Sequence, residues 1–104
     1  MRHTAKELLY WASILASDGA TVITAAVGAG VEDLAGRRLE QAQLESAETS
    51  HMIVMHAADA AQLPAQGYVL CDGVLYVVDY TRDPRDPRPH VWTEVYCHVE
   101  KGGN

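Results

Sequence analysis

The sequence has few cysteines, few basic residues and no long apolar stretch, and each shortage excludes a class of protein. Among its 104 residues, Cys71 and Cys97 are the only cysteines, too few for a fold held together by disulfides. We expect both to be thiols in a reducing compartment. No apolar run approaches the roughly 18 residues that span a bilayer, so no contact with a membrane is expected. The first residues lack the apolar core of a signal peptide, which predicts residence in the cytoplasm where the chain is made.

Basic residues are scarce relative to acidic ones: 8 Lys and Arg stand against 14 Asp and Glu, a net charge of −6. Tight binding to nucleic acid needs several basic side chains matched to phosphates, and this balance argues against it. An acidic wall is instead suited to a passage that duplex DNA slides through, because such a wall does not hold the phosphates. The charge therefore excludes a strong nucleic-acid binder but not a channel for DNA.

The common catalytic and metal-binding motifs are also missing. There is no phosphate-binding glycine loop, no Gly-x-Ser-x-Gly and no His-Glu-x-x-His. The residues most like metal ligands are His51, His56, Cys71, Cys97 and His98. The two cysteines do not form the short-range pair of a zinc site, and neighbours such as Cys97 and His98 point to opposite faces of a strand. We expect no catalytic residue, no metal and no cofactor, and we keep a thiol or metal enzyme using Cys71 or Cys97 as a remote alternative.

What is present is the composition of one folded domain, 1–104, with 48% hydrophobic and 21% charged residues. Residues 4–15 are ambiguous, since Thr4 and Glu7 have the spacing of a helix capping box while the aromatic pair after Leu9 and a following Asp-Gly turn favour a strand. We favour the strand. A hairpin is predicted at Asp72, where Asp-Gly separates two apolar runs.

The remaining pattern predicts a mainly β protein. Strands are expected at 22–31, 49–57, 68–71, 74–81 and 91–99, a helix at about 35–47, loops at 59–67 and 82–89, and a frayed tail at 101–104. About six strands and one helix suggest a small antiparallel β-barrel with the helix inserted between strands 2 and 3. Residues 74–81 are apolar on both faces, with Val74, Tyr76, Val78 and Tyr80 on one of them. Either the helix or a neighbouring subunit must cover the outer face, and we expect an oligomer.

Four short motifs occur in order along the chain. Val-Gly-Ala-Gly-Val-Glu-Asp-Leu-Ala-Gly-Arg-Arg-Leu occupies 27–39, and Gln-Ala-Gln follows at 41–43. Thr-Ser-His-Met-Ile stands at 49–53, and Asp-Gly-Val-Leu-Tyr-Val-Val stands at 72–78. Each motif alone is weak, but the ordered set with its spacing is more specific.

This set resembles the head–tail joining proteins of tailed bacteriophages, also called head-closure, head-completion or stopper proteins. In that family a strand runs into a Val-Glu-x-Leu-x-Gly-Arg helix start, a later strand opens with Thr-His-x-x-Ile, and a hairpin reads Asp-Gly-x-x-Tyr-x-Ile. The likeness runs from about residue 22 to residue 100, with Cys97 near the end of the last strand. The chain departs from the family at Gly28, where an aromatic is usual, and in its N-terminal strand, so the stopper and adaptor subtypes both stay open.

The resemblance implies a structural protein of the virion neck, made in the host bacterial cytoplasm. Six or twelve copies would form a homo-oligomeric ring below the portal or an adaptor ring, retain the packaged genome, and offer a platform to a tail terminator or tail tube protein. In stopper members the segment between strands 2 and 3 reaches toward the channel, which carries over to about 33–48. The channel-facing residues are then Asp33, Glu40, Glu45 and Glu48.

Two further groups of residues complete the prediction. The expected ring interface contains Arg37, Arg38, Leu39, Gln43, Tyr76 and Tyr80, and the expected docking loop carries Arg82, Arg85 and Arg88. An alternative from another class is a small oligonucleotide-binding barrel that stacks bases on exposed aromatics. The sequence has aromatic residues for this role in Trp11, Trp92 and five tyrosines, but it lacks the basic charge that such a protein needs.

Overall fold

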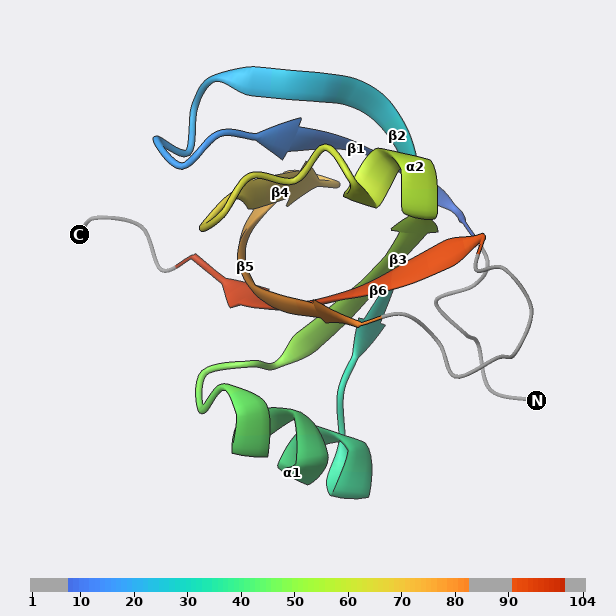
Figure 1. Cartoon of the computed structure of the whole chain (residues 1–104). Helices are drawn as coiled ribbons and strands as arrows, with labels where there is room; N and C mark the ends of the chain where they lie inside the picture. Colours follow the sequence, from blue (N-terminus) through green and yellow to red (C-terminus); the bar gives the residue numbers. More distant parts are fainter. Residues whose placement is uncertain (1–7, 83–90, 101–104) are drawn as a thin grey trace.

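The computed structural model describes residues 8–82 and 91–100, which form six strands and two helices (Figure 1). In chain order these are β1 (Tyr10–Leu15), β2 (Val22–Asp33), α1 (Gly36–Glu45), β3 (His51–His56), α2 (Ala57–Ala60), β4 (Tyr68–Cys71), β5 (Val74–Arg82) and β6 (Trp92–Val99). The predicted mainly β fold, with a helix between strands 2 and 3, is confirmed. Among the described residues, no helix has the length and apolar character needed to cross a membrane.

The strands close into an antiparallel barrel in the order β1-β2-β3-β6-β5-β4. Pairing of β1 with β4, with Ala12 opposite Cys71 and Leu15 opposite Tyr68, completes the ring of strands. Closure matters because an open sheet would leave unpaired backbone groups along two edges. Any contact with another copy of the chain therefore has to use side chains on the outside of the barrel or at its ends.

The ambiguous N-terminal segment is a strand in its described part, and the turn after it explains why. The Asp18 carboxylate accepts hydrogen bonds from the backbone N–H of Ala20 and of Thr21, each at 2.8 Å, and from the Thr21 hydroxyl at 2.6 Å. Gly19 takes a φ of 70°, which a residue with a side chain rarely adopts. The Asp-Gly turn thus folds β2 back onto β1, as a hairpin signal of this kind predicts.

The barrel interior holds one apolar cluster to which every strand contributes. Its buried members are Ala12, Ile14, Val27, Ala29, Ile53, Met55, Val69, Cys71, Tyr76, Val95 and Cys97. They alternate with outward residues along each strand, because successive side chains of a strand point to opposite faces. In β3, for example, Ile53 and Met55 face inward while Met52 and Val54 face outward, although all four are buried.

A second cluster lies outside the barrel, under α1. Its buried residues are Leu34, Ala42, Met52, Val54 and Tyr96, with Leu39, Tyr80 and Trp92 packed around them. Helix α1 thus covers the outer face of β3, β5 and β6, as Figure 1 shows below the barrel. These strands are apolar on both faces, and on this side the helix, rather than a neighbouring subunit, covers the outer face.

Strand β5 carries an irregularity that corrects one prediction. Val78 lies opposite Cys97, but Tyr80 lies opposite Tyr96, so one extra residue, Asp79, is inserted between them. Such a bulge breaks the alternation of faces. Tyr76 therefore points into the barrel, only 6% exposed, while Tyr80 points outward beneath α1. The prediction that these two tyrosines share one outer face was wrong, and Tyr76 is not available to a ring interface.

The helical content also differs in detail from the prediction. Helix α1 is shorter than the predicted 35–47, because Ser46 already has an extended backbone and ends it. Helix α2 was not predicted. Its four residues overlap the end of the predicted strand 49–57 and the start of the predicted loop 59–67, and they are too few to give a helical period in the sequence. The predicted tail 101–104 and all of the predicted loop 82–89 except Arg82 lie outside the described residues.

Candidate functional site

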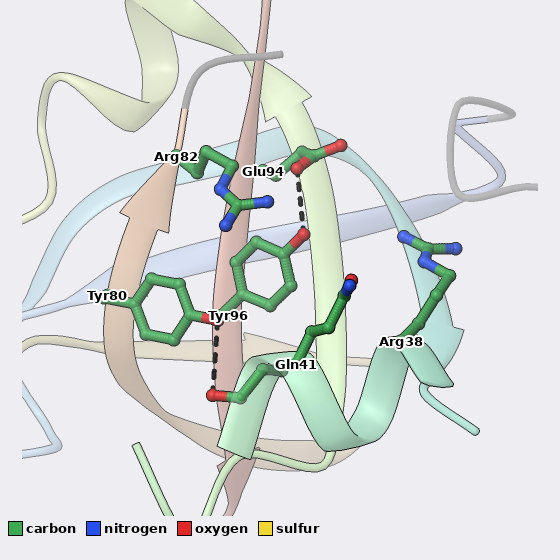
Figure 2. A pocket seen from close by; sticks show the side chains of 7 residues that line it. Arg38, Gln41, Tyr80, Arg82, Glu94 and Tyr96 are labelled. Atoms are coloured by element: carbon green, nitrogen blue, oxygen red, sulfur yellow. Dashed lines mark hydrogen bonds between the residues drawn. The ribbon is translucent and has the colours of Figure 1, made fainter. Parts of the chain in front are cut away.

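A polar pocket of about 160 Å³ opens between α1 and the outer faces of β5 and β6 (Figure 2). Its lining residues are Arg38, Gln41, Ala42, Tyr80, Arg82, Glu94 and Tyr96. Three of these residues were predicted as functional, Arg38 and Tyr80 in the ring interface and Arg82 in the docking loop. The fold brings them together, although Arg38 is more than forty positions away from Tyr80 and Arg82 in the sequence.

Two stacked tyrosines form the inner wall of this pocket. The rings of Tyr80 and Tyr96 lie 4.7 Å apart and 6° from parallel. The Tyr96 hydroxyl donates to a Glu94 carboxylate oxygen at 2.9 Å, and the Tyr80 hydroxyl donates to the carbonyl oxygen of Ala42 at 3.5 Å (Figure 2). Burial, with a smaller contribution from Glu94, raises the pKa of Tyr96 to about 12, and burial also raises the pKa of Tyr80. Both phenols are therefore neutral donors at physiological pH.

The charged residues that line the pocket are Arg38, Arg82 and Glu94. Arg38 pairs with Glu32 of β2 and also donates to the Met52 sulfur at 3.5 Å. The guanidinium carbon of Arg82 lies 5.8 Å from the centre of the Tyr96 ring, within range of a cation–π contact. The pocket thus presents one planar cation, Arg82, beside an aromatic ring, together with the Glu94 carboxylate.

The other predicted interface residues lie outside this pocket. Arg37 is exposed on α1, and Leu39 packs in the cluster under the helix. The side-chain amide of Gln43 donates to the carbonyl oxygen of Thr49 at 3.1 Å, so it ties α1 to the start of β3. Its role in the structure is therefore to hold the helix in place. Arg85 and Arg88 of the predicted docking loop lie outside the described residues.

The four carboxylates predicted to face a channel are all exposed. Glu40 and Glu45 lie on α1, and Asp33 and Glu48 flank it. Asp33 pairs with the His51 Nε2 at 2.9 Å, while the Nδ1 of the same ring bonds the Ser50 hydroxyl at 2.7 Å. The helix and its flanks therefore form an acidic surface, with Arg37 and Arg38 at its N-terminal end.

A second polar group lies near the other end of α1, and the sequence did not predict it. His98 Nδ1 bonds the Asp79 carboxylate at 2.9 and 3.0 Å, and the Thr49 hydroxyl donates to the same carboxylate at 2.8 Å. The other ring nitrogen of His98 faces Glu48, with 3.6 Å between Nε2 and Oε1. The bulge in β5 turns Asp79 to this position, and no spacing in the sequence signals a bulge.

Both cysteines are free thiols buried inside the barrel. Burial raises the pKa of Cys71, and burial with the nearby Asp79 raises the pKa of Cys97 well above its ordinary value. The Cys97 thiol donates to the carbonyl oxygen of His51 at 3.7 Å. Because the thiolate is the reactive form, burial makes both thiols less reactive than an exposed cysteine.

The outer face of β1, β2 and β4 also carries apolar residues, but these residues are exposed, whereas those under α1 are buried. Trp11 (76% exposed) and Leu70 point outward on this side, because each is next to an inward-facing residue of its strand. Val22 and Ile23 of β2 are also exposed. Trp11 lies opposite Gly28 across the β1–β2 pair, and Leu70 lies opposite Ser13 across β1–β4. In the described part of the chain neither helix covers this side of the barrel (Figure 1). We call the outward surface of Trp11 and Leu70 the bare face.

Comparison with known proteins adds no relative. No protein-family model matches the chain, and neither the curated proteins nor the solved structures contain a match.

Proposed function

We propose that this chain is a structural protein of the neck of a tailed phage, which assembles as a ring between the portal or adaptor complex and the tail. The single observation that carries the proposal is the bare face, because a closed barrel with a covered side has no internal use for an apolar outer surface on the other. The ordered motifs that resemble head–tail joining proteins, and the helix inserted between β2 and β3, support the same reading.

A ring requires a head-to-tail contact between two different surfaces of the chain. The bare face is one of them. The other is the side of α1, which carries the exposed Leu44 (85% exposed) and Arg37 and lies across the barrel from β1 and β2 (Figure 1). In this arrangement the apolar bare face of one copy packs near α1 of the next, and a partial ring keeps one free surface at each of its two ends until it closes.

The acidic surface of α1 then faces the channel. Asp33, Glu40, Glu45 and Glu48 are exposed carboxylates, and the whole chain has a net charge of −6. Such a wall repels phosphates, so the genome passes without being held. The pocket beside Arg82 is the site that a carboxylate of the adjoining portal, adaptor or tail protein would use.

The proposal is tested by removing the bare face. Trp11→Asp places a charge where a neighbour would pack, so the variant should remain folded but fail to add a ring to the cognate portal in electron micrographs. Val91→Asp is the matched control, since Val91 is also an exposed apolar residue but lies just before β6, away from the bare face. Phage lacking the protein should accumulate DNA-filled heads that leak and carry no tails. Tailed, infectious particles in its absence would refute the proposal.

A second candidate function is a single-stranded oligonucleotide-binding barrel, which the exposed Trp11 favours because an exposed indole is a stacking platform for bases. Filter binding at low salt separates the two functions. Retention of labelled single-stranded DNA that is lost in Trp11→Ala would favour the oligonucleotide binder over the ring protein.

A further inference from the structure

Glu48, Asp79 and His98 form a compact group of potential metal ligands near the C-terminal end of α1. Their potential ligand atoms lie within 4.8 Å of one another. Asp79 is 8% exposed and lies against the imidazole Nδ1, so it fixes the ring and favours the tautomer with its proton on Nδ1. In that tautomer the Nε2 carries a lone pair and no proton.

In that tautomer Nε2 faces another acceptor, the Glu48 carboxylate, across 3.6 Å. This separation is longer than the roughly 2.7–3.2 Å of an N–H···O hydrogen bond. It is close to the distance between two ligands of one metal ion, because bonds of about 2.0–2.2 Å at a tetrahedral angle hold the two donor atoms about 3.4 Å apart. Two acceptors that face each other need a cation between them, either a proton or a metal ion.

Space for such an ion and its remaining ligands is present beside the pair. A cavity of about 530 Å³ is lined by Glu48, Ser50, His98, Val99 and Glu100. Glu48 reaches it from the segment after α1 with a side chain that is 78% exposed, and His98 reaches it from β6. An ion at Nε2 would therefore contact solvent and could take water as further ligands.

We propose that this cavity is a divalent transition-metal site, of the zinc class, with His98 Nε2 and Glu48 as ligands. Asp79 acts as the outer carboxylate that orients the imidazole and makes it a better donor, as in many histidine–zinc sites. An imidazole nitrogen favours zinc and its neighbours in the transition series over magnesium and calcium, which prefer oxygen ligands. The site is independent of the proposed neck function, and either can fail without the other.

The test uses the full chain, freed of metal by a chelator and titrated with Zn²⁺ by calorimetry. Glu48→Gln removes the charged ligand from an exposed position, so the fold is not at risk, and it should weaken Zn²⁺ binding about tenfold or more. Glu45→Gln is the matched control, because it makes the same change at an exposed carboxylate of α1 and should bind as the wild type does.

A spectroscopic measurement separates a metal ion from a proton. In ¹H–¹⁵N spectra of the imidazole rings, Zn²⁺ should shift the Nε2 resonance of His98 and leave that of His56, an exposed histidine stacked on Trp92, unchanged. Absence of Zn²⁺ binding, equal affinity in Glu48→Gln and Glu45→Gln, or a His98 Nε2 that stays protonated at saturating Zn²⁺ would each overturn the proposal. The last outcome would identify a proton as the cation between the two side chains.

Discussion

Both sides of this barrel carry apolar residues on their outer faces, but only one side buries them. Beneath α1, the outward residues Met52, Val54 and Tyr96 are buried in a second cluster. Across the barrel, Trp11 and Leu70 are exposed in the described part of the chain. The comparison teaches that one inserted helix can bury the outer apolar residues on one side of a small barrel. The exposed apolar residues on the other side are then the surface that a partner could cover.

The largest expected effect comes from removing a residue of the covered side. Tyr96→Ala deletes a ring that stacks on Tyr80 and packs under α1, so it should lower the free energy of unfolding by about 3 kcal/mol or more. Urea unfolding followed by circular dichroism measures the change. A loss below about 1 kcal/mol would show that α1 does not depend on this contact for its position.

A smaller effect is expected from the backbone that starts the covering helix. Gly36 has a φ of 57° and open space where a Cβ would lie, so Gly36→Ala introduces backbone strain without a clash and should cost about 1 kcal/mol of stability. Gly28→Ala on the other side is the matched control. Its Cβ would meet only the Leu8 side chain, at an ordinary contact distance of 3.6 Å, so its stability should not fall. Thermal unfolding measures both variants. An equal loss of stability in Gly36→Ala and Gly28→Ala would contradict the expected difference between the two sides of the barrel.

On the bare face, a truncation should leave the isolated chain almost as stable as before. Trp11→Ala removes a side chain that is largely in solvent, and the free energy of unfolding should change by less than about 0.5 kcal/mol in dilute solution. The measurement is the urea midpoint at low protein concentration. A loss as large as that of Tyr96→Ala would mean that Trp11 is buried by another part of the chain, and the comparison would fail.

The smallest effect is a pH dependence at the hairpin of the bare side. Hydrogen bonds from the Thr21 side chain, then from the backbone N–H groups of Thr21 and Ala20, lower the pKa of Asp18 from 3.8 to about 2. Because the folded-state pKa is depressed, the stabilising contribution is present above pH 3.8 and is lost as the pH falls toward 2. Asp18→Asn should flatten the stability profile in that window. A wild-type slope retained in the variant would assign the acid sensitivity to other carboxylates.

Local sequence signals were sufficient for much of the fold. The Asp-Gly pair at Asp72 predicts the β4–β5 hairpin, since it supplies the positive φ values that a two-residue turn requires, and the structure has 52° and 78° there. The helix formers after Gly36 predict α1. The candidate site was only partly predictable: Arg38, Tyr80 and Arg82 could be named one by one, but not the pocket that unites them.

What the sequence determined by itself, then, was the kind and order of the elements, because turns, alternation and helix propensity act between residues close in the chain. What only the tertiary structure decided was the side on which each residue lies. A single inserted residue, Asp79, sends Tyr76 into the barrel and Tyr80 to its surface, and the same bulge places Asp79 against His98. Register across paired strands depends on contacts between distant segments, and a one-residue shift exchanges inside for outside without leaving a mark in the local pattern.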